Sequence, residues 1–439
     1  MKSTAAPSTD SLVSLAVSLH QSGHPKEAEE LYESALKQTP DNADALHFLG
    51  ILRHQQGRSE EAIGLVRKSL VSNPHYVDAR VNLGNIYKET ERYDEARRAY
   101  QWVIDRNSKH AESLNNLAVV LRVLDDTEQA IELFERAIIQ QPQNATFHQN
   151  LGNALKSVAR VEDALTAYRR AVELDPKMTT AHLSLGRALY VFGRIEEAVV
   201  VYKQWLQVEP ENAVAKHMLA ACEGGQVPER CSDEFVKQSF DAFASSFDEV
   251  LDRLEYRAPS LIEEAVTETL PEPSRQFSIL DAGCGTGLCG EALRSYASRL
   301  VGIDLSPKML VKASARKCFD ELQEAELSEF MVTHTNEFDV IISADTLVYF
   351  GALERAFDAA SIALRGNGYL LFTVEHWEQP TEIGYQLNPH GRYSHGEQYV
   401  RNSLHRAGFE VLAMDQETLR REVRRPVTGL VVTAQLADR

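Results

Sequence analysis

Two patterns of apolar and polar positions divide the chain. In the first half, prolines recur on a 34-residue grid at positions 40, 74, 142, 176 and 210, with Ser108 in the remaining place. Two series of small residues share this period: one is Ala28, Ala62, Ala96, Ala130, Ala164 and Ala198, and the other is Gly50, Gly84, Ala118, Gly152, Gly186 and Ala220. This period predicts pairs of antiparallel helices, each of which buries its apolar face against the next pair.

From Phe277 onward the pattern changes to short apolar runs separated by helical segments. We predict strands over residues 277–282, 300–304, 338–344, 368–375, 409–414 and 430–435, and a weakly marked third strand somewhere within 322–330. The intervening helices begin near Gly287, Pro307, Gly351 and Gly396. This alternation predicts a parallel sheet with helices on both faces. The last two strands are too close for a crossover helix and are expected to form an antiparallel hairpin.

The periodic half resembles tetratricopeptide repeats over residues 9–223, with six helical pairs and a closing helix over 213–222. The resemblance implies a superhelix with a concave groove lined by the first helix of each pair. Asparagines recur at groove positions of these helices: Asn82, Asn85, Asn116, Asn150 and Asn153. An asparagine ladder can pair with the backbone of an extended peptide, because each side chain carries a donor and an acceptor. Scaffolding or dimer contact is the alternative.

The glycine turn after the first predicted strand allows two interpretations. Residues 285–290 match G-x-G-x-x-G, and Asp304 stands at about the distance expected for a nicotinamide dinucleotide site. In that motif, however, the first glycine leaves the strand directly. Here the chain leaves the strand through Asp281-Ala-Gly283, and Gly285 comes two residues after Gly283.

The pattern apolar-Asp-x-Gly-x-Gly-Thr-Gly resembles the motif of class I S-adenosylmethionine-dependent methyltransferases at every position. The resemblance implies this cofactor, with Asp281 near its charged amino acid end and Asp304 accepting both ribose hydroxyls. The cofactor-binding residues it implies are Asp281, Gly283, Cys284, Gly285, Gly287, Asp304, Leu305, Met309, Glu326, Leu327, Ala344 and Asp345. There are two alternatives to these cofactor contacts: Asp281 only caps the loop, and Glu326 faces solvent.

Acceptor chemistry is expected at the carboxyl edge of the sheet. We predict catalytic roles for Asp345, Tyr349 and His395, with His395 as a general base, although a histidine in a loop is often structural. In the same loop, Arg392 is expected to hold a carboxylate of the substrate, next to Tyr393. Direct methyl displacement needs mainly alignment, so a base is not obligatory.

Aromatic residues precede the first strand at helical spacing. Phe240, Phe243 and Phe247 fall on one helical face, and Tyr256 follows. We predict a lid that covers the cofactor and substrate, with Phe243, Phe247 and Tyr256 contacting the substrate. Simple docking of this face onto the catalytic core is the alternative.

The net charge of −18 is concentrated in residues 226–439, which carry 21 basic and 34 acidic residues. This balance, without a basic patch, argues against a nucleic acid substrate. Five cysteines without a CxxC pair predict no zinc site and a reducing compartment. No apolar run is long enough for a membrane span, and the start lacks an export signal, so we expect a cytoplasmic protein.

Together these features predict two domains, an all-α tetratricopeptide superhelix over 1–225 and a Rossmann-like α/β methyltransferase domain over 226–439 with a mostly parallel seven-stranded sheet. The second part resembles bacterial predicted methyltransferases with tetratricopeptide repeats, sharing Phe-Asp-x-Phe-Ala, Tyr-Arg-Ala-Pro and Gly-Arg-Tyr-x-His in this order. We expect S-adenosylmethionine-dependent methylation of oxygen or nitrogen, on a small molecule or on a protein bound in the groove. The alternatives are a scaffold with an inactive methyltransferase fold and a nicotinamide oxidoreductase.

Overall fold

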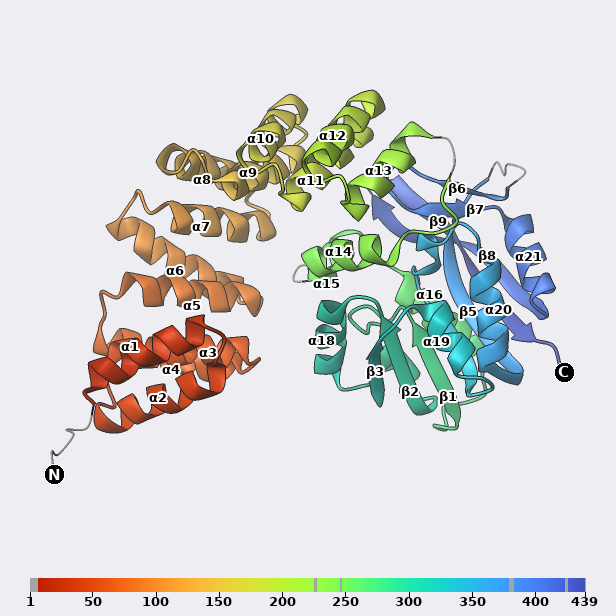
Figure 1. Ribbon diagram of the computed structural model, residues 1–439, viewed down its shortest axis with the longest axis horizontal. Helices are drawn as coiled ribbons and strands as arrows, with labels where there is room; N and C mark the ends of the chain where they lie inside the picture. The colour runs from red at the N-terminus through yellow and green to blue at the C-terminus, as the bar shows by residue number, and fades with distance from the viewer. Residues whose placement is uncertain (1–6, 225–226, 245–246, 379–382, 423–424, 439) are drawn as a thin grey trace. The chain divides into compact units, whose positions relative to one another are not determined.

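The computed structural model describes residues 7–224, 227–244, 247–378, 383–422 and 425–438 (Figure 1). The chain divides into two compact units, Met1–Leu185 and Gly186–Arg439. The boundary that the sequence predicts, between residues 225 and 226, lies outside the described residues. No helix among the described residues is both long enough and apolar enough to cross a membrane.

The first unit consists of helical pairs that follow one another along the chain, as Figure 1 shows from α1 to α10. Its helices are α1 (Thr9–Gln21), α2 (Pro25–Gln38), α3 (Ala43–Gln55), α4 (Ser59–Ser72), α5 (Val77–Glu89), α6 (Tyr93–Arg106), α7 (Ala111–Val123), α8 (Thr127–Gln140), α9 (Ala145–Ser157) and α10 (Val161–Leu174). Helix α11 (Thr179–Val191) contains the boundary between the units, and α12 (Ile195–Val208) and α13 (Ala213–Glu223) belong to the second unit. Within the described residues, the predicted helical pairs and closing helix are confirmed.

The periodic small residues lie where the two helices of a pair touch. The alanine at position 28 and those that follow it at 34-residue intervals up to 198 have no exposed surface. A Cβ added at Gly84 would lie 2.6 Å from the ring of Tyr100, and one at Gly152 would lie 2.6 Å from the ring of Tyr168. The period therefore reflects close helix packing, in which an aromatic ring of the second helix occupies the space left by a missing side chain.

The second unit is built on a mixed sheet. Its strands are β1 (Phe277–Ala282), β2 (Ala297–Asp304), β3 (Glu321–Glu324), β4 (Phe338–Ser343), β5 (Leu364–His376), β6 (Tyr385–Leu387), β7 (Tyr393–His395), β8 (Phe409–Glu422) and β9 (Arg425–Leu436). The order β3-β2-β1-β4-β5 is parallel, β9 pairs antiparallel with β5, and β8 pairs antiparallel with β9. These seven strands confirm the predicted mostly parallel sheet with a terminal hairpin.

Alternating side chains of the central strands bury both faces of the sheet. Leu280, Ile341 and Phe372 face a core that includes residues of α19 (Leu327–Thr333) and α20 (Glu354–Ala363). Ile279, Val340 and Leu371 face the opposite core, which includes residues of α16 (Ala258–Thr269). A strand buried on both sides explains why the sequence reads as an uninterrupted apolar run.

The remaining helices of this unit are α14 (Asp233–Phe243), α15 (Phe247–Arg253), α17 (Gly290–Leu293), α18 (Pro307–Arg316), α21 (Glu397–Arg406) and the short 3-10 helix η2 (Leu347–Tyr349). The structure differs from the predicted elements in two places. Strand β3 occupies the start of the range predicted for it and begins one residue earlier, at Glu321, while residues 327–330 of that range belong to α19. The predicted loop over residues 387–396 contains β7, which pairs with β5 and with β6.

Candidate cofactor and acceptor site

Strand β1 places Asp281 and the glycine turn that follows it at the carboxyl edge of the sheet. Gly283, Gly285 and Gly287 have φ angles of 85°, 54° and 84°, a region that residues with a side chain rarely adopt. A Cβ at Gly283 would also lie 2.3 Å from Oγ1 of Thr346, the loop residue that follows β4. The turn therefore needs glycine both for its conformation and for its close approach to the neighbouring loop.

Asp281 is a buried carboxyl group without a complete set of partners. It is 1% exposed, and its Oδ2 has no hydrogen-bond partner among the described residues. Burial raises the pKa of Asp281 to about 8, and the negative charge of Asp304 contributes to this rise. A cationic ligand group at this position would supply the missing partner and favour the charged carboxylate.

Asp304, at the end of β2, is held by two backbone groups. The N–H of Gly285 donates to its Oδ2 at 2.9 Å, and the N–H of Ser306 donates to its Oδ1 at 2.8 Å. Burial raises the pKa of Asp304, while these hydrogen bonds act in the opposite direction. The carboxylate is thus oriented between two loops, with lone pairs left for ligand hydroxyls.

Helices α14 and α15 place aromatic rings next to the loop after β4. The ring centroid of Phe240 lies 5.4 Å from that of Tyr349 and 5.9 Å from that of Phe247, and the rings of Phe243 and Phe247 are 5.7 Å apart. Pairs of this kind contribute about 0.5–1.5 kcal/mol beyond their buried area.

Two hydrogen bonds join the same segment to the loops that follow β1 and β2. The hydroxyl of Ser306 donates to Asp241 at 2.6 Å, and the hydroxyl of Thr286 donates to Asp248 at 2.6 Å. The aromatic segment is therefore attached to the glycine turn and to the loop of Asp304.

A buried cluster of charges lies beyond the end of β4. Asp345 has a φ of 54° and its N–H donates to Oγ1 of Thr373 at 2.8 Å. Arg420 of β8 donates to both carboxylate oxygens of Asp345, at 3.0 and 2.9 Å, and also pairs with Glu375 and Glu422. Its side chain is only 3% exposed. Strained backbone of this kind persists where the surroundings impose it, and it is common at functional sites.

Arg392 completes this cluster. Its Nε donates to Glu375 at 2.7 Å, and it also pairs with Glu422. Burial alone would raise the pKa of Glu375, but the positive charges of Arg392 and Arg420 outweigh it and lower the pKa to about 2. For Asp345 burial dominates and raises the pKa, although Arg420 opposes it. The carboxylates are thus held by arginines within the protein.

Comparison with known families gives two matches. A tetratricopeptide repeat model matches residues 13–77, 81–145 and 150–213, and a methyltransferase domain model matches residues 280–372. The chain carries tetratricopeptide repeats followed by a methyltransferase domain. The cofactor of this domain is S-adenosylmethionine.

Three curated relatives align with parts of the methyltransferase domain. Human methyltransferase-like protein 27 is 34% identical over 110 residues, which are 25% of this chain and 45% of the relative. The ubiquinone biosynthesis O-methyltransferase of Pelagibacter ubique is 26% identical over 28% of this chain and 52% of its own length. The malonyl-[acyl-carrier protein] O-methyltransferase of Enterobacter lignolyticus is 30% identical over 23% of this chain and 41% of its own length. The chain spans about half the length of the curated relatives it matches.

Two solved structures are among those to which the chain is similar. A putative S-adenosylmethionine-dependent methyltransferase from Listeria monocytogenes gives a TM-score of 0.33 at 20% identity, covering 41% of this chain and 99% of that one. Pseudomonas aeruginosa pilF gives a TM-score of 0.42 at 20% identity, covering 48% of this chain and 96% of that one.

The geometry of the glycine turn fits the cofactor of the methyltransferase domain. The unpartnered Oδ2 of Asp281 suits the ammonium group of S-adenosylmethionine, and the oriented carboxylate of Asp304 suits its ribose hydroxyls. Of the other residues predicted for the cofactor, Leu305 and Ala344 are half-buried, whereas Met309, Cys284 and Leu327 are buried.

Glu326 has partners within the protein. It is 6% exposed, accepts a hydrogen bond from the N–H of Glu329 at the start of α19, and pairs with Arg230 at 3.3 Å. The alternative of a solvent-facing glutamate is therefore wrong. Its carboxylate caps a helix.

His395, predicted as a base, has no exposed surface. Its Nε2 lies 2.8 Å from the carbonyl oxygen of Phe350 and 3.1 Å from that of Gly351, so this nitrogen carries the proton and donates. Its Nδ1 has no partner among the described residues, and burial lowers the pKa of the ring to about 4. The two hydrogen bonds of Nε2 link β7 to the loop after β4. The role of His395 as a base stays a prediction.

Three tyrosines are also predicted for the acceptor site. Tyr349 and Tyr256 are half-buried, and burial raises the pKa of both phenols, that of Tyr349 to about 12. Tyr393 is fully buried and its hydroxyl donates to the carbonyl oxygen of Pro228 at 2.8 Å. The hydroxyl of Tyr393 is therefore used in a contact within the protein.

The charge cluster contains three residues that the sequence analysis did not select: Arg420, Glu375 and Glu422. Arg420 and Glu422 lie in a charged stretch that resembles an exposed connection, and Glu375 ends a strand whose preceding residues are apolar. The signal available from sequence was an arginine at an inward position of a terminal strand.

In the repeats, the predicted groove asparagines bond mainly to each other and to neighbouring rings. Asn116 donates to Asn85 at 3.1 Å, and Asn82 bonds to the ring of His47 at 2.9 Å. Asn150 donates to the adjacent Asn115 at 3.0 Å, while Asn153 accepts from the hydroxyl of Tyr168 at 2.9 Å. The first three bonds link successive repeats, and the last joins the two helices of one pair. Peptide capture by the asparagines stays a prediction.

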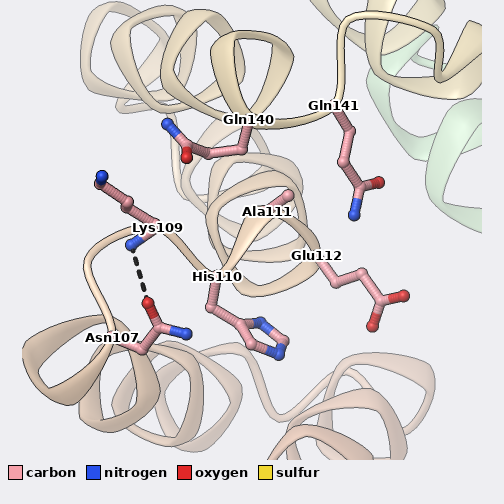
Figure 2. A pocket seen from close by; sticks show the side chains of 7 residues that line it. All are labelled: Asn107, Lys109, His110, Ala111, Glu112, Gln140 and Gln141. Atoms are coloured by element: carbon pink, nitrogen blue, oxygen red, sulfur yellow. Dashed lines mark hydrogen bonds between the residues drawn. The ribbon is translucent and has the colours of Figure 1, made fainter.

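A pocket of about 360 Å³ lies in the first unit, at the junction between α6 and α7 (Figure 2). It is lined by Asn107, Lys109, His110, Ala111, Glu112, Gln140 and Gln141. The hydrogen bond from the N–H of Lys109 to Asn107, at 3.1 Å, belongs to the turn between the helices. The pocket is thus formed by inter-repeat turns and contains none of the predicted cofactor or acceptor residues.

Proposed function

We propose that this protein transfers the methyl group of S-adenosylmethionine to an oxygen or nitrogen atom of a small molecule held beneath the aromatic segment of α14 and α15. The observation that carries the proposal is the buried, unpartnered Oδ2 of Asp281 beside a turn of three glycines in left-handed conformations. Such a site suits a cationic ligand that the backbone approaches closely.

When bound, the cofactor supplies a methyl group on a cationic sulfur, which an acceptor lone pair displaces as the carbon–sulfur bond breaks. The chain's own part is mainly to align the acceptor and exclude water, since a displacement of this kind depends on orientation. The rings of Phe240, Phe243 and Phe247 pack against one another, and Phe240 packs against Tyr349 of the loop after β4. We assign them the role of a lid.

The loop after β4 carries two polar groups of interest, Tyr349, whose ring contacts Phe240, and Asp345. The phenol of Tyr349 is neutral at pH 7, as any phenol is, and burial raises its pKa further, to about 12, so it can donate a hydrogen bond to an acceptor. Asp345, whose two carboxylate oxygens both accept from Nη1 of Arg420, orients that loop. A small acceptor is favoured over a protein because the lid is attached at both cofactor loops by Asp241 and Asp248.

The test uses methyl-labelled S-adenosylmethionine and a cell extract, with the full-length protein and the cofactor-site variant Asp304→Asn. We expect label in the small-molecule fraction with the unmodified protein, and at least tenfold less with the variant. Label confined to proteins would overturn the small-molecule acceptor in favour of a protein in the repeat groove. No transfer of label to any fraction would favour the scaffold alternative.

A further inference from the structure

A second cavity, of about 290 Å³, lies at the carboxyl end of β5 in the second unit. Strand β5 runs there between two partners, because Glu375 pairs with Ser394 of β7 on one edge and with Gly429 of β9 on the other. The cavity contains none of the residues predicted for the cofactor, for catalysis or for the substrate. It is lined by residues 375–378 and 426–428 and by Gln386, Asn388, His390 and Ser394.

Asn388 holds one wall of this cavity in place. Its N–H donates to the carbonyl oxygen of Arg392 at 2.8 Å, and its side-chain amide donates to the same oxygen at 3.1 Å and to Oγ of Ser394 at 3.2 Å. Its Oδ1 accepts from the side chain of Gln386 at 2.9 Å. The turn between β6 and β7, which carries His390, is therefore fixed by bonds within the protein.

Two side chains of the lining each have one polar atom that forms no hydrogen bond with the described residues. Oε1 of Glu375 accepts from Nε of Arg392 at 2.7 Å and from Arg420, which leaves Oε2. Nδ1 of His390 accepts from the N–H of Arg392 at 3.3 Å, so the neutral ring carries its proton on Nε2. Oε2 and Nε2 are 3.5 Å apart, beyond the usual limit of about 3.2 Å for an N–H···O hydrogen bond.

The charge states of these two groups agree with this geometry. The side chain of Glu375 is 5% exposed, and its pKa of about 2 keeps it ionised at pH 7. Burial, together with the charge of Arg392, lowers the pKa of His390 to about 4, which keeps the ring neutral. A hydrogen-bond acceptor and a donor thus lie side by side in the cavity wall, too far apart to satisfy each other.

This pair of atoms discriminates between classes of ligand. An ammonium group has donors only and would leave the Nε2–H of His390 without an acceptor, whereas an anion would meet the carboxylate of Glu375. A hydroxyl group satisfies both atoms, because it can donate to Oε2 and accept from Nε2–H. The indole of Trp377 and the side chains of Pro426 and Val427 also line the cavity and offer surface to an aromatic ring.

We propose that this cavity binds a neutral aromatic molecule whose hydroxyl group bridges Oε2 of Glu375 and Nε2 of His390, with the ring packed against Trp377. The site is distinct from the glycine turn and from the aromatic segment of α14 and α15. Binding here does not depend on the proposed methyl transfer.

The experiment follows the indole N–H signals of the full-length protein by NMR, after isotope labelling of tryptophan. The tryptophans of the chain are Trp102, Trp205 and Trp377, and the signal of Trp377 is identified by its loss in Trp377→Phe. The probes are phenol, its methyl ether anisole and the cation benzylamine, each titrated up to the millimolar range. The variants are His390→Phe and the matched control His405→Phe, which changes an exposed histidine of α21. Thermal unfolding of each variant checks its fold.

We expect phenol to shift the signal of Trp377 and to leave those of Trp102 and Trp205 in place. Its dissociation constant should be at least tenfold lower than those of anisole and benzylamine, because its hydroxyl bonds to a charged carboxylate. His390→Phe should weaken phenol binding at least threefold, and His405→Phe should leave it unchanged.

Equal affinity for phenol and anisole, or tighter binding of benzylamine, would overturn the hydroxyl-bearing class of ligand. Phenol binding that does not shift the signal of Trp377, or that His390→Phe does not weaken, would overturn the site. If His390→Phe fails to fold, the comparison of the three probes on the unmodified protein decides.

Discussion

At the scale of single residues, Asp281 is the group that we propose links the fold to the cofactor. Its carboxyl group is buried at the end of a central strand, and Oδ2 has no partner among the described residues. Burial raises its pKa from 3.8 to about 8, so the cofactor-free protein loses unfolding free energy as the pH rises from about 4 to about 8. A bound ammonium group reverses this effect because it favours the carboxylate.

The first prediction concerns proton release. At pH 7 Asp281 is mostly protonated in the cofactor-free protein, so binding of S-adenosylmethionine should release about one proton. Titration calorimetry in buffers of different ionisation enthalpy measures this number. Asp281→Asn should bring it close to zero, whereas binding without proton release in the unmodified protein would show that Asp281 is already charged.

Residues of the candidate cofactor site could be proposed from sequence, while those of the charge cluster could not. Asp281, the glycines and Asp304 lie within one short stretch and the next strand, so local spacing identifies them. Arg420, Glu375 and Arg392 come from three segments that only the sheet brings together. A charged residue far from its partner in the chain looks like an exposed one.

At the scale of elements, apolar pattern predicted the central strands and failed at the edges. Strand β3 reads Glu-Leu-Gln-Glu and is mostly exposed, so it carries no apolar signal. Strands β6 and β7 have three residues each, which is too short to show a periodic pattern of apolar residues. The repeats were predictable because close packing requires small residues at fixed intervals.

The lid segment gives the second prediction. Replacing both Asp241 and Asp248 with alanine removes the hydrogen bonds from Ser306 and Thr286. We expect S-adenosylmethionine to dissociate about threefold to tenfold faster, since bonds to charged groups contribute roughly 1.5–3 kcal/mol before solvent weakens them. Stopped-flow fluorescence measures the rate. Asp252→Ala, on the exposed side of α15, is the control, and an unchanged rate in the double variant would remove the lid role.

The third prediction tests the repeat register with two glycines. Gly84→Ala places a methyl group 2.6 Å from the ring of Tyr100 and should destabilise the repeats by about 1–3 kcal/mol. Gly64→Ala, inside α4 with no atom within 4 Å of the new methyl group, should stabilise them by about 0.5–1 kcal/mol. Urea unfolding followed by circular dichroism measures both. Changes of equal sign would contradict the packing described here.

At the scale of the whole molecule, the compact units do not follow the boundary between the two sequence patterns. The second unit begins at Gly186 and includes α12 and α13 together with the methyltransferase domain. Phe235 of α14, which is 5% exposed, packs its ring 4.1 Å from that of His217. The closing helix of the repeats thus contributes to the core of the catalytic unit.

The fourth prediction compares two shortened chains. A fragment that begins at residue 179 should bind S-adenosylmethionine as the full chain does. A fragment that begins at residue 227 should be less stable by roughly 2–5 kcal/mol, because Phe235 and Gly391 lose their partners on α13. Denaturant unfolding measures the difference. Equal stability of the two fragments would show that the last repeat adds nothing to the catalytic unit.

The most direct test of the central claim is calorimetric titration of the full-length protein with S-adenosylmethionine, for the unmodified chain, Asp304→Asn and the exposed control Asp358→Asn. The account predicts one cofactor per chain, at least tenfold weaker binding in Asp304→Asn because an amide cannot accept from both Gly285 and Ser306, and no change in Asp358→Asn. Absence of binding, or equal affinity in all three proteins, would contradict it.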